Sequence, residues 1–327
     1  MARRSRAPIA VTCGDPSGIG PEIAVAAWSQ LREEYPIIWV GDPRHLPDGT
    51  PYKVLDNSDD PQLISSQCLP VHPIEFAALA SPGRPEPGNA SGVIAAIERA
   101  VELTKSSKVG GLCTAPISKY ELVTHAEFQF PGHTEFLEHL GGASRAVMML
   151  ASDELRVVPA TIHIPLKDVP NALSSVLLEE TIQIVHAAMK TDFGIVDPKI
   201  AVAGLNPHAG ENGMLGSEDG DIILPVCDRL RDQGMSLMGP LPADTMFHAA
   251  ARKNYDVAIA MYHDQALIPI KTLAFDKGVN VTLGLPFVRT SPDHGTAFDI
   301  AGKGVADPTS MIEAIKLASQ MAERRNS

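Results

Sequence analysis

Three histidines carry the clearest chemical signal in this chain of 327 residues, because each lies in its own predicted turn, and the turns of His163 and His208 contain Gly or Pro. His163 is in Thr-Ile-His-Ile-Pro, His208 is in Asn-Pro-His-Ala-Gly, and His263 is in Met-Tyr-His-Asp-Gln. Three neutral imidazoles that converge from separate strand ends hold a divalent cation and leave one coordination position open, as a catalytic zinc site requires. Widely separated histidines have no diagnostic spacing, and the chain has 11 of them, so these residues alone only suggest a metal site.

Two glycine-containing stretches are candidates for a cofactor site. The first, Gly14 to Glu22, is not a G-x-G-x-x-G fingerprint, because three residues and then one residue separate its glycines, and a tight strand-to-helix turn also explains it. In the second, His294 to Gly304, Gly295 permits close backbone approach, and Thr296 and Asp299 can hydrogen-bond a sugar or an amide. The turn that follows supplies unpaired amides for an anion. Taken alone, this second stretch is also explained as a capped helix start.

These residues must be positioned by an alternation of strand-length apolar runs with helix-length amphipathic stretches. The alternation predicts an α/β protein with largely parallel strands. We predict strands at Ile9 to Cys13, Ile37 to Val40, Gly111 to Cys113, Ala146 to Leu150, Arg156 to Ala160, Ile200 to Ala203 and Val257 to Ala260. We predict helices that open at Pro21, run from an Asn89 cap to about Lys105, start near Glu135, and span 178–190, 221–232 and 308–325.

Composition, with 44% hydrophobic residues, favours a protein with a substantial core, and the length favours about two domains. The net charge is -12 and the only basic cluster is Arg3, Arg4 and Arg6, which argues against a nucleic-acid partner, since phosphate backbones need clustered Lys and Arg. No apolar run approaches the roughly 20 residues that cross a bilayer, and we identify no export signal, so we expect no membrane partner. Four cysteines without a Cys-x-x-Cys pair predict a reducing, cytoplasmic location.

Seven stretches of the chain are long or compositionally unusual: Gly14 to Glu22, Cys113 to Lys119, Gly132 to Phe136, Asn206 to Glu211, Gly239 to Phe247, Met261 to Gln265 and Gly278 to Thr296. Together they resemble the 4-hydroxythreonine-4-phosphate dehydrogenase family of pyridoxal phosphate biosynthesis. The resemblance covers nearly the whole chain, and no site motif departs from the family pattern. The family groups with the isocitrate and isopropylmalate dehydrogenases, which bind NAD through an HGTA-containing loop in place of a Rossmann fingerprint.

The resemblance implies a two-domain fold of the isocitrate and isopropylmalate dehydrogenase type, with the active site in the interdomain cleft. In such folds the chain leaves the first domain, builds a second and returns. We therefore predict a discontinuous first domain, 1–130 with 268–327, that carries the NAD loop, and a second domain, 131–267, with the metal ligands and dimer contacts. The resemblance also implies a homodimer whose active sites are shared between subunits.

By the same resemblance, both subunits contribute the three histidines as ligands of one divalent cation per site. Zinc suits imidazole best, with cobalt or magnesium as alternatives. The resemblance assigns substrate binding to His133, Thr134, Lys271, Asn280 and Arg289, and cofactor binding to His294, Gly295, Thr296 and Asp299. Lys271 and Arg289 suit phosphate and carboxylate, and unpaired amides near His133 favour an anion. Without the resemblance, these two cations are ordinary solvated charges and His133 merely caps a helix. Asp244 and Asp264 are candidates that orient ligands or move protons.

These roles predict NAD-dependent or NADP-dependent oxidation and decarboxylation of 4-phosphooxy-L-threonine to 3-amino-2-oxopropyl phosphate. A bound cation lowers the pKa of the substrate hydroxyl and stabilises the enolate left by loss of carbon dioxide. Enzymes of the same fold that act on another phosphorylated four-carbon acid (4-phosphoerythronate or threonate 4-phosphate) or on a terephthalate dihydrodiol are an alternative. A zinc hydrolase or a ligand-binding protein without redox activity is a third reading, which leaves His294 to Gly304 without a role.

Overall fold

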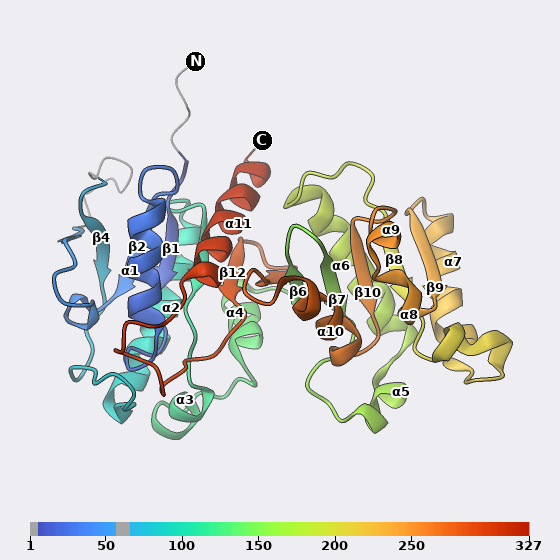
Figure 1. Cartoon of the computed structure of the whole chain (residues 1–327), viewed down its shortest axis with the longest axis horizontal. Helices are drawn as coiled ribbons and strands as arrows, with labels where there is room; N and C mark the ends of the chain where they lie inside the picture. Colours follow the sequence, from blue (N-terminus) through green and yellow to red (C-terminus); the bar gives the residue numbers. More distant parts are fainter. Residues whose placement is uncertain (1–5, 57–65, 327) are drawn as a thin grey trace, which may run out of the picture. The chain divides into compact units, whose positions relative to one another are not determined.

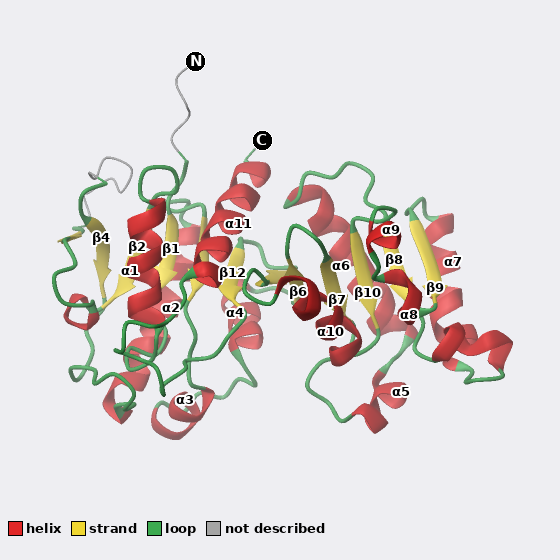
Figure 2. Ribbon diagram, viewed as in Figure 1, coloured by secondary structure: helices red, strands yellow, loops and turns green. Residues whose placement is uncertain are grey.

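Residues 6–56 and 66–326 are described by the computed structural model of the chain, which is drawn in Figure 1. Arg3 and Arg4 of the predicted basic cluster lie outside the described residues. Helices accompany the strands in both halves of the chain (Figure 2), and the predicted α/β class is confirmed. Among the helices within the two described ranges, none has the length and apolar content that crossing a bilayer requires.

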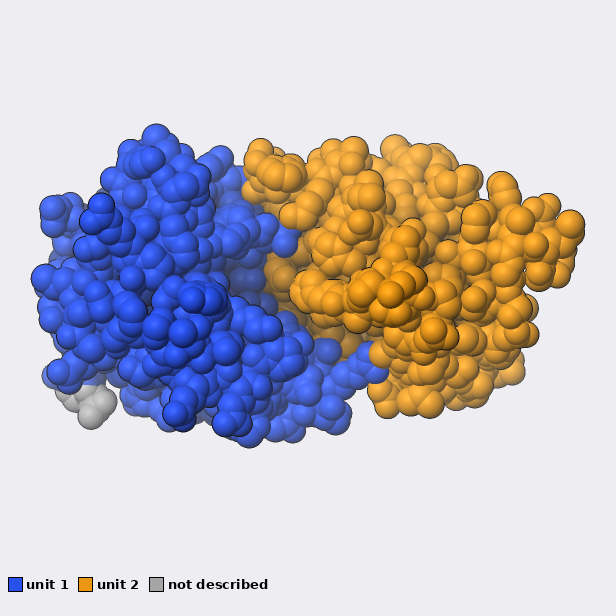
Figure 3. Space-filling model, turned by 90° about the horizontal axis from the view of Figure 1, so that it is seen from below, with its two compact units in different colours: residues 1–146, 285–327 blue, residues 147–284 orange. Residues whose placement is uncertain are grey.

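The chain divides into two compact units, which have different colours in Figure 3. Unit 1 comprises residues 1–146 and 285–327, and unit 2 comprises residues 147–284. These borders differ from the predicted ones, and the predicted border at 268 falls inside helix α10 (His263–Ala274). A helix is a continuous hydrogen-bonded element, so a domain border is placed more naturally in the loop after strand β11 (Val279–Leu283).

Unit 1 is built on parallel strands in the order β3-β4-β2-β1-β5-β12. Strands β1, β2 and β5 are buried along their whole length, as expected for parallel strands that helices cover on both faces. The strands are β1 (Ile9–Thr12), β2 (Ile37–Gly41), β3 (Tyr52–Val54), β4 (Leu69–Pro73), β5 (Gly111–Thr114) and β12 (Arg289–Pro292).

The helices of unit 1 are α1 (Gly20–Leu31), α2 (Ala90–Lys105), α3 (Lys119–His125), α4 (His133–Gly141) and α11 (Thr309–Arg325). Helix α2 packs against β1, β2 and β5, whereas α11 packs against β12 and β5. Pro21 lies in the first turn of α1, where its missing amide hydrogen costs no helical hydrogen bond. Asn89 precedes α2, but the predicted side-chain cap is wrong. Its Oδ1 instead accepts a hydrogen bond of 3.0 Å from the backbone N–H of Ala78.

Unit 2 is built on strands in the order β11-β6-β7-β10-β8-β9. The pairs β11–β6 and β6–β7 are antiparallel, whereas β7, β10, β8 and β9 run parallel to one another. The strands are β6 (Val147–Ala151), β7 (Arg156–Pro159), β8 (Ile200–Ala203), β9 (Leu237–Leu241), β10 (Val257–Ala260) and β11 (Val279–Leu283). Four of these six were predicted from their apolar runs, and β9 and β11 were not.

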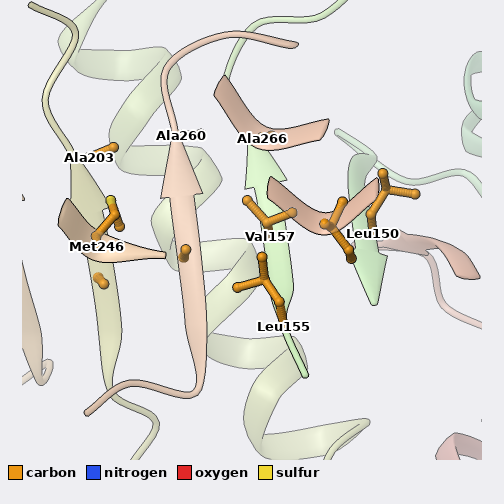
Figure 4. Close-up of a cluster of buried hydrophobic side chains, with 10 residues drawn as sticks. Leu150, Leu155, Val157, Ala203, Met246, Ala260 and Ala266 are labelled. Atoms are coloured by element: carbon orange, nitrogen blue, oxygen red, sulfur yellow. The ribbon is translucent and has the colours of Figure 1, made fainter. Parts of the chain in front are cut away.

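The helices of unit 2 are α5 (Val169–Ala172), α6 (Ser175–Thr191), α7 (Leu224–Asp232), α8 (Ala243–Met246), α9 (Ala249–Arg252) and α10. Helix α10 packs against β7, β10 and β6. Figure 4 shows a buried cluster to which α10 contributes Ala266 and the strands contribute Leu150, Val157 and Ala260. Small side chains at Ala260 and Ala266 let the helix lie close to the sheet, and this packing fixes the amino-terminal end of α10, where His263 lies.

Candidate functional site

The three histidines singled out in the sequence follow neighbouring parallel strands of unit 2. His163 follows β7, His263 follows β10, and His208 follows β8, and these strands lie in the order β7-β10-β8. The carboxyl ends of parallel strands meet at one edge of a sheet, so all three turns lie at the same edge. His263 is in fact the first residue of helix α10, and its turn is therefore shorter than predicted.

The rings of His163 and His263 lie next to each other at this edge, with centroids 5.7 Å apart and planes tilted by 44°. This separation allows both rings to face one ion bound about 2.0 to 2.1 Å from each nitrogen. The Nδ1 atom of His263 lies 2.6 Å from the Asp264 carboxylate, which leaves Nε2 as the nitrogen available to a ligand. A cavity of about 310 Å³ borders His163, His263 and Asp264. The rest of its lining is mostly apolar and consists of Ile162, Ile164, Leu166, Val169, Tyr262 and Thr161.

His208 lies in an unusual turn in which five successive residues, 208–212, have positive φ angles between 42° and 79°. L-residues avoid this left-handed region at a cost of roughly 1 to 2 kcal/mol each, so the surrounding structure must hold the turn. The His208 side chain is exposed. Over residues 6–56 and 66–326, no group of three or more His, Cys, Asp or Glu side chains of this single chain is placed to hold a metal ion. The chain thus pairs two of the three histidines and leaves His208 apart from them.

Side chains that the sequence analysis did not single out hold these turns by hydrogen bonds to the backbone. They are Thr161, Asp219 and Gln265. Each reaches a residue far away in sequence, such as Gln265 to Gly204, so the sequence offers no local pattern that would have identified them.

Unit 1 contains the second group of predicted residues, centred on Arg289 of β12. Arg289 is only 3% exposed, and its Nε and one terminal nitrogen donate hydrogen bonds of 3.2 and 2.7 Å to Oγ1 of Thr114. Burial lowers the pKa of Arg289 to about 10, so the guanidinium remains charged at neutral pH. A charged guanidinium that is buried this deeply is costly by itself, and it therefore attracts an anion strongly.

His133 lies next to this cation, at the first position of helix α4. Burial and the charge of Arg289 lower the pKa of His133 well below 6.5, so its ring is neutral. Its Nε2 atom is buried and has no hydrogen-bond partner among the described residues. Buried polar atoms are nearly always hydrogen-bonded, so this nitrogen fits a site that takes a polar ligand. Thr134 follows in the same first turn, where backbone amides and the helix dipole favour an anion.

The predicted cofactor loop packs closely against the strand-to-helix turn that begins at Gly14. The backbone N–H of Ile19 donates a hydrogen bond of 3.0 Å to the carbonyl oxygen of Thr296. A Cβ on Gly18 would lie 2.7 Å from the same oxygen, so only glycine fits there. His294 is exposed and its Nδ1 lies 3.1 Å from the carbonyl oxygen of Gly295, and Asp299 is also exposed. The glycines of the first stretch thus serve close backbone packing.

The remaining predicted residues lie in unit 2. Lys271 is on α10, where its Nζ lies 5.5 Å from the ring centroid of Phe275, and Asn280 is on β11 opposite Leu150. Asp244 is exposed in the first turn of α8. Each of these residues is accessible or only half-buried, which is compatible with ligand contact.

Comparisons with known proteins agree across the chain. The model of the family described as pyridoxal phosphate biosynthetic protein PdxA matches residues 33–318. A 4-hydroxythreonine-4-phosphate dehydrogenase from Roseobacter denitrificans is 61% identical over 319 residues, which are 97% of this chain and 98% of the relative.

Solved structures show the same relationship. The 4-hydroxythreonine-4-phosphate dehydrogenase from Klebsiella pneumoniae matches with a TM-score of 0.88 and 36% identity, over 97% of this chain and 99% of that chain. A terephthalate 1,2-cis-dihydrodiol dehydrogenase from Burkholderia xenovorans matches with a TM-score of 0.68 and 29% identity, over 96% of this chain and 98% of that chain.

Proposed function

The chain belongs to the family of the pyridoxal phosphate biosynthetic protein PdxA and is a dehydrogenase, and from this premise we propose its substrate and cofactors. We propose that it oxidises and decarboxylates 4-phosphooxy-L-threonine to 3-amino-2-oxopropyl phosphate, with NAD or NADP as the hydride acceptor. The single observation that supports this substrate best is the buried Arg289 beside the unpartnered Nε2 of His133.

The anion site of unit 1 is suited to a phosphate ester. Arg289 offers a permanent charge and a planar fork, and Thr114 fixes the orientation of that fork. His133 is held neutral, so it can accept or donate one hydrogen bond without adding charge. Thr134 adds a hydroxyl and a first-turn amide. Lys271 and Asn280 are further proposed contacts to the substrate.

His163, His208 and His263 are the proposed ligands of one divalent cation, with zinc as first choice and cobalt or magnesium as alternatives. The donor set fits, because it consists of imidazoles and Asp264 orients one of them through Nδ1. When bound, such a cation supplies Lewis acidity at the substrate hydroxyl and at the carbonyl that oxidation creates. The Asp264 carboxylate keeps the His263 ring in one orientation, and Asp244 is a proposed proton carrier.

A second copy of the chain is the proposed source of the missing histidine. The single chain does not gather three ligands among its described residues, yet exposed apolar side chains, Ile164 and Leu166, border the His163 turn. Exposed apolar groups next to a site mark a contact surface. We therefore propose a homodimer with shared sites, in a reducing cytoplasm that is compatible with four free cysteine thiols.

The loop from His294 to Asp299, which includes Gly295 and Thr296, is the proposed binding site of the nicotinamide cofactor. The bound cofactor accepts the hydride, and the protein must hold it against the substrate. The backbone contact between Ile19 and Thr296 supports this role, because it immobilises the loop.

The test is NADH formation with a substrate panel. Purified protein with Zn²⁺ and NAD or NADP is given 4-phosphooxy-L-threonine, 4-phosphoerythronate, threonate 4-phosphate or the dihydrodiol of terephthalate, and carbon dioxide is measured in parallel. Equimolar NADH and carbon dioxide from 4-phosphooxy-L-threonine alone is the expected result. Turnover confined to another compound would contradict the proposed substrate.

The dihydrodiol is a second candidate, because the cavity beside His163 and His263 has a mostly apolar lining that suits a ring. The similarity to the terephthalate dihydrodiol dehydrogenase also favours it. We rank it second, because the matching 4-hydroxythreonine-4-phosphate dehydrogenases have higher identity to this chain.

A further inference from the structure

A chain of hydrogen bonds links the three histidine turns of unit 2 through the backbone of Met261. Met261 lies two residues before His263, and its carbonyl oxygen accepts a hydrogen bond of 2.7 Å from Oγ1 of Thr161. Thr161 itself lies two residues before His163. The turn that follows β7 is therefore fixed to the turn that follows β10 at equivalent positions.

Gln265 extends this link to the third turn. Its Oε1 accepts a hydrogen bond of 2.6 Å from the backbone N–H of Met261, and its Nε2 donates one of 2.8 Å to the carbonyl oxygen of Gly204. Gly204 lies at the end of β8, four residues before His208. One amide side chain thus joins the carboxyl ends of β10 and β8.

The two hydrogen bonds of Gln265 have different purposes. Gln265 is the third residue of α10, and a Gln or Glu at this position commonly reaches back to an unpaired amide at the helix start. The bond to Met261 fits that capping role. The bond from Nε2 to Gly204 adds nothing to the helix, since Gly204 follows strand β8, so it requires a separate explanation.

Asp219 stabilises the segment between β8 and the His208 turn. It is 2% exposed, and its carboxylate accepts hydrogen bonds from the backbone N–H groups of Leu205 and Asn206 at 2.9 and 3.1 Å. A Cβ on Gly204 would lie 2.6 Å from Asp219 Oδ1, so the carboxylate and the strand end fit closely together. The left-handed residues 208–212 start two residues after Asn206.

We infer that Gln265 is a positioning residue of the shared metal sites: it fixes the His208 turn and the His263 turn of one chain relative to each other, with Asp219 as its support, so that each chain presents its histidines to the two sites of the proposed dimer in one arrangement. The inference rests on the proposed metal site. A strained left-handed turn persists only where its surroundings over-determine it, and these side chains supply that constraint. Without the hydrogen bond from Gln265 Nε2 to Gly204, the ligand histidines are therefore no longer held in fixed positions, and cation binding weakens.

The decisive variant is Gln265→Glu, because it separates the two roles. Glutamate keeps the oxygen that caps α10, but it places a second oxygen against the Gly204 carbonyl, where two acceptors repel each other. The added negative charge by itself favours cation binding. A lower affinity for Zn²⁺ would therefore come from displaced ligand histidines. Gln233→Glu is the matched control, since Gln233 is exposed at the end of α7 in the same unit.

The dissociation constant of Zn²⁺ is measured on the full chain by competition with a chromophoric chelator, and Co²⁺ absorption reports the ligand geometry. We expect Gln265→Glu to bind Zn²⁺ about tenfold more weakly and to change the Co²⁺ spectrum, while the unfolding midpoint of the metal-free protein stays close to that of the wild type. Asp219→Asn should weaken binding in the same direction, and the exposed Asp221→Asn should not.

Two outcomes overturn the inference, and they are distinguishable. If the wild type binds Zn²⁺ and Gln265→Glu binds it equally or more tightly, with an unchanged Co²⁺ spectrum, Gln265 only caps the helix. If the wild type itself binds no divalent cation, the proposed metal site fails, and the positioning role fails with it.

Discussion

Replacing Arg289 by methionine removes the buried guanidinium while keeping an unbranched side chain at the start of β12. The variant loses both hydrogen bonds to Thr114 and the charge that faces His133. A hydrogen bond between a charged group and its partner contributes about 1.5 to 3 kcal/mol, which corresponds to roughly a ten- to hundredfold change in an equilibrium or rate constant. We expect kcat/KM for 4-phosphooxy-L-threonine to fall by at least that factor.

The folded state should tolerate this change better than catalysis does. Burial of the guanidinium is itself costly, as its lowered pKa of about 10 indicates, so methionine relieves a desolvation penalty while it removes the bonds to Thr114. The free energy of unfolding, measured with urea, should therefore change by no more than about 2 kcal/mol. Arg99→Met is the control, because Arg99 is a half-buried arginine of unit 1 outside the proposed site, and its side chain donates hydrogen bonds to His72 and Glu102.

The assay compares phosphorylated and unphosphorylated 4-hydroxythreonine by NADH formation. In the wild type the unphosphorylated compound should be a poor substrate, and Arg289→Met should reduce the difference between the two compounds, because the lost contact is to the phosphate. If a stable Arg289→Met protein keeps kcat/KM for the phosphorylated substrate within twofold of the wild type, the buried cation does not hold the phosphate. The reasoning from Arg289 to the substrate class would then be wrong.

The remaining predictions concern the metal, the cofactor loop and pH. His208→Ala, or treatment with a chelator, should abolish most turnover while NAD binding, followed by fluorescence titration, stays nearly intact; full turnover in metal-free protein would contradict the role. Gly18→Ala should weaken NAD binding at least tenfold, because its Cβ would lie 2.7 Å from the Thr296 oxygen, whereas Gly220→Ala, with open space around its Cβ, should not. The pKa of His133 is lowered on folding, so unfolding takes up a proton below pH 6.5, and stability is lost as pH falls, by up to about 1.4 kcal/mol per pH unit. Urea unfolding at pH 7.5 and 5.5 should therefore show a smaller acid loss for His133→Gln than for the wild type, and equal losses would disprove the burial argument.

The parts of the fold that the sequence predicted are those whose pattern is local. Strands such as Ile200–Ala203 and Val257–Ala260 are short runs of buried apolar residues between polar turns, and the structure has them at the predicted bounds. Strand β12, Arg-Thr-Ser-Pro, is buried but polar, so no hydrophobic pattern distinguishes it from a loop. Strand β9 contains a glycine and a proline, which usually argue against a strand.

The candidate site could be predicted only at positions where the residue type itself indicates a chemical role, such as metal binding by histidine. His163 and His263 were predicted as partners and the structure brings them together, but the left-handed conformation of Ala209 and Glu211 has no signal in their residue types. Gln265 was overlooked because its second partner lies 61 residues away, and its importance depends on tertiary contacts alone. Helix α10 also contains Pro269, which would ordinarily argue against a helix there.

The order in which the strands are synthesised has a consequence for when the anion site can form. Unit 2 is a single continuous segment, so all its strand partners are available once residue 284 has been made. Unit 1 is different, because Arg289 pairs beside Leu112 of β5, and α11 follows still later. Domains generally acquire structure as their chain is completed, and distant pairings form slowly. A nascent chain that stops before β12 therefore has the histidine edge but lacks Arg289, the proposed phosphate-binding cation, and we expect no turnover until synthesis is nearly finished.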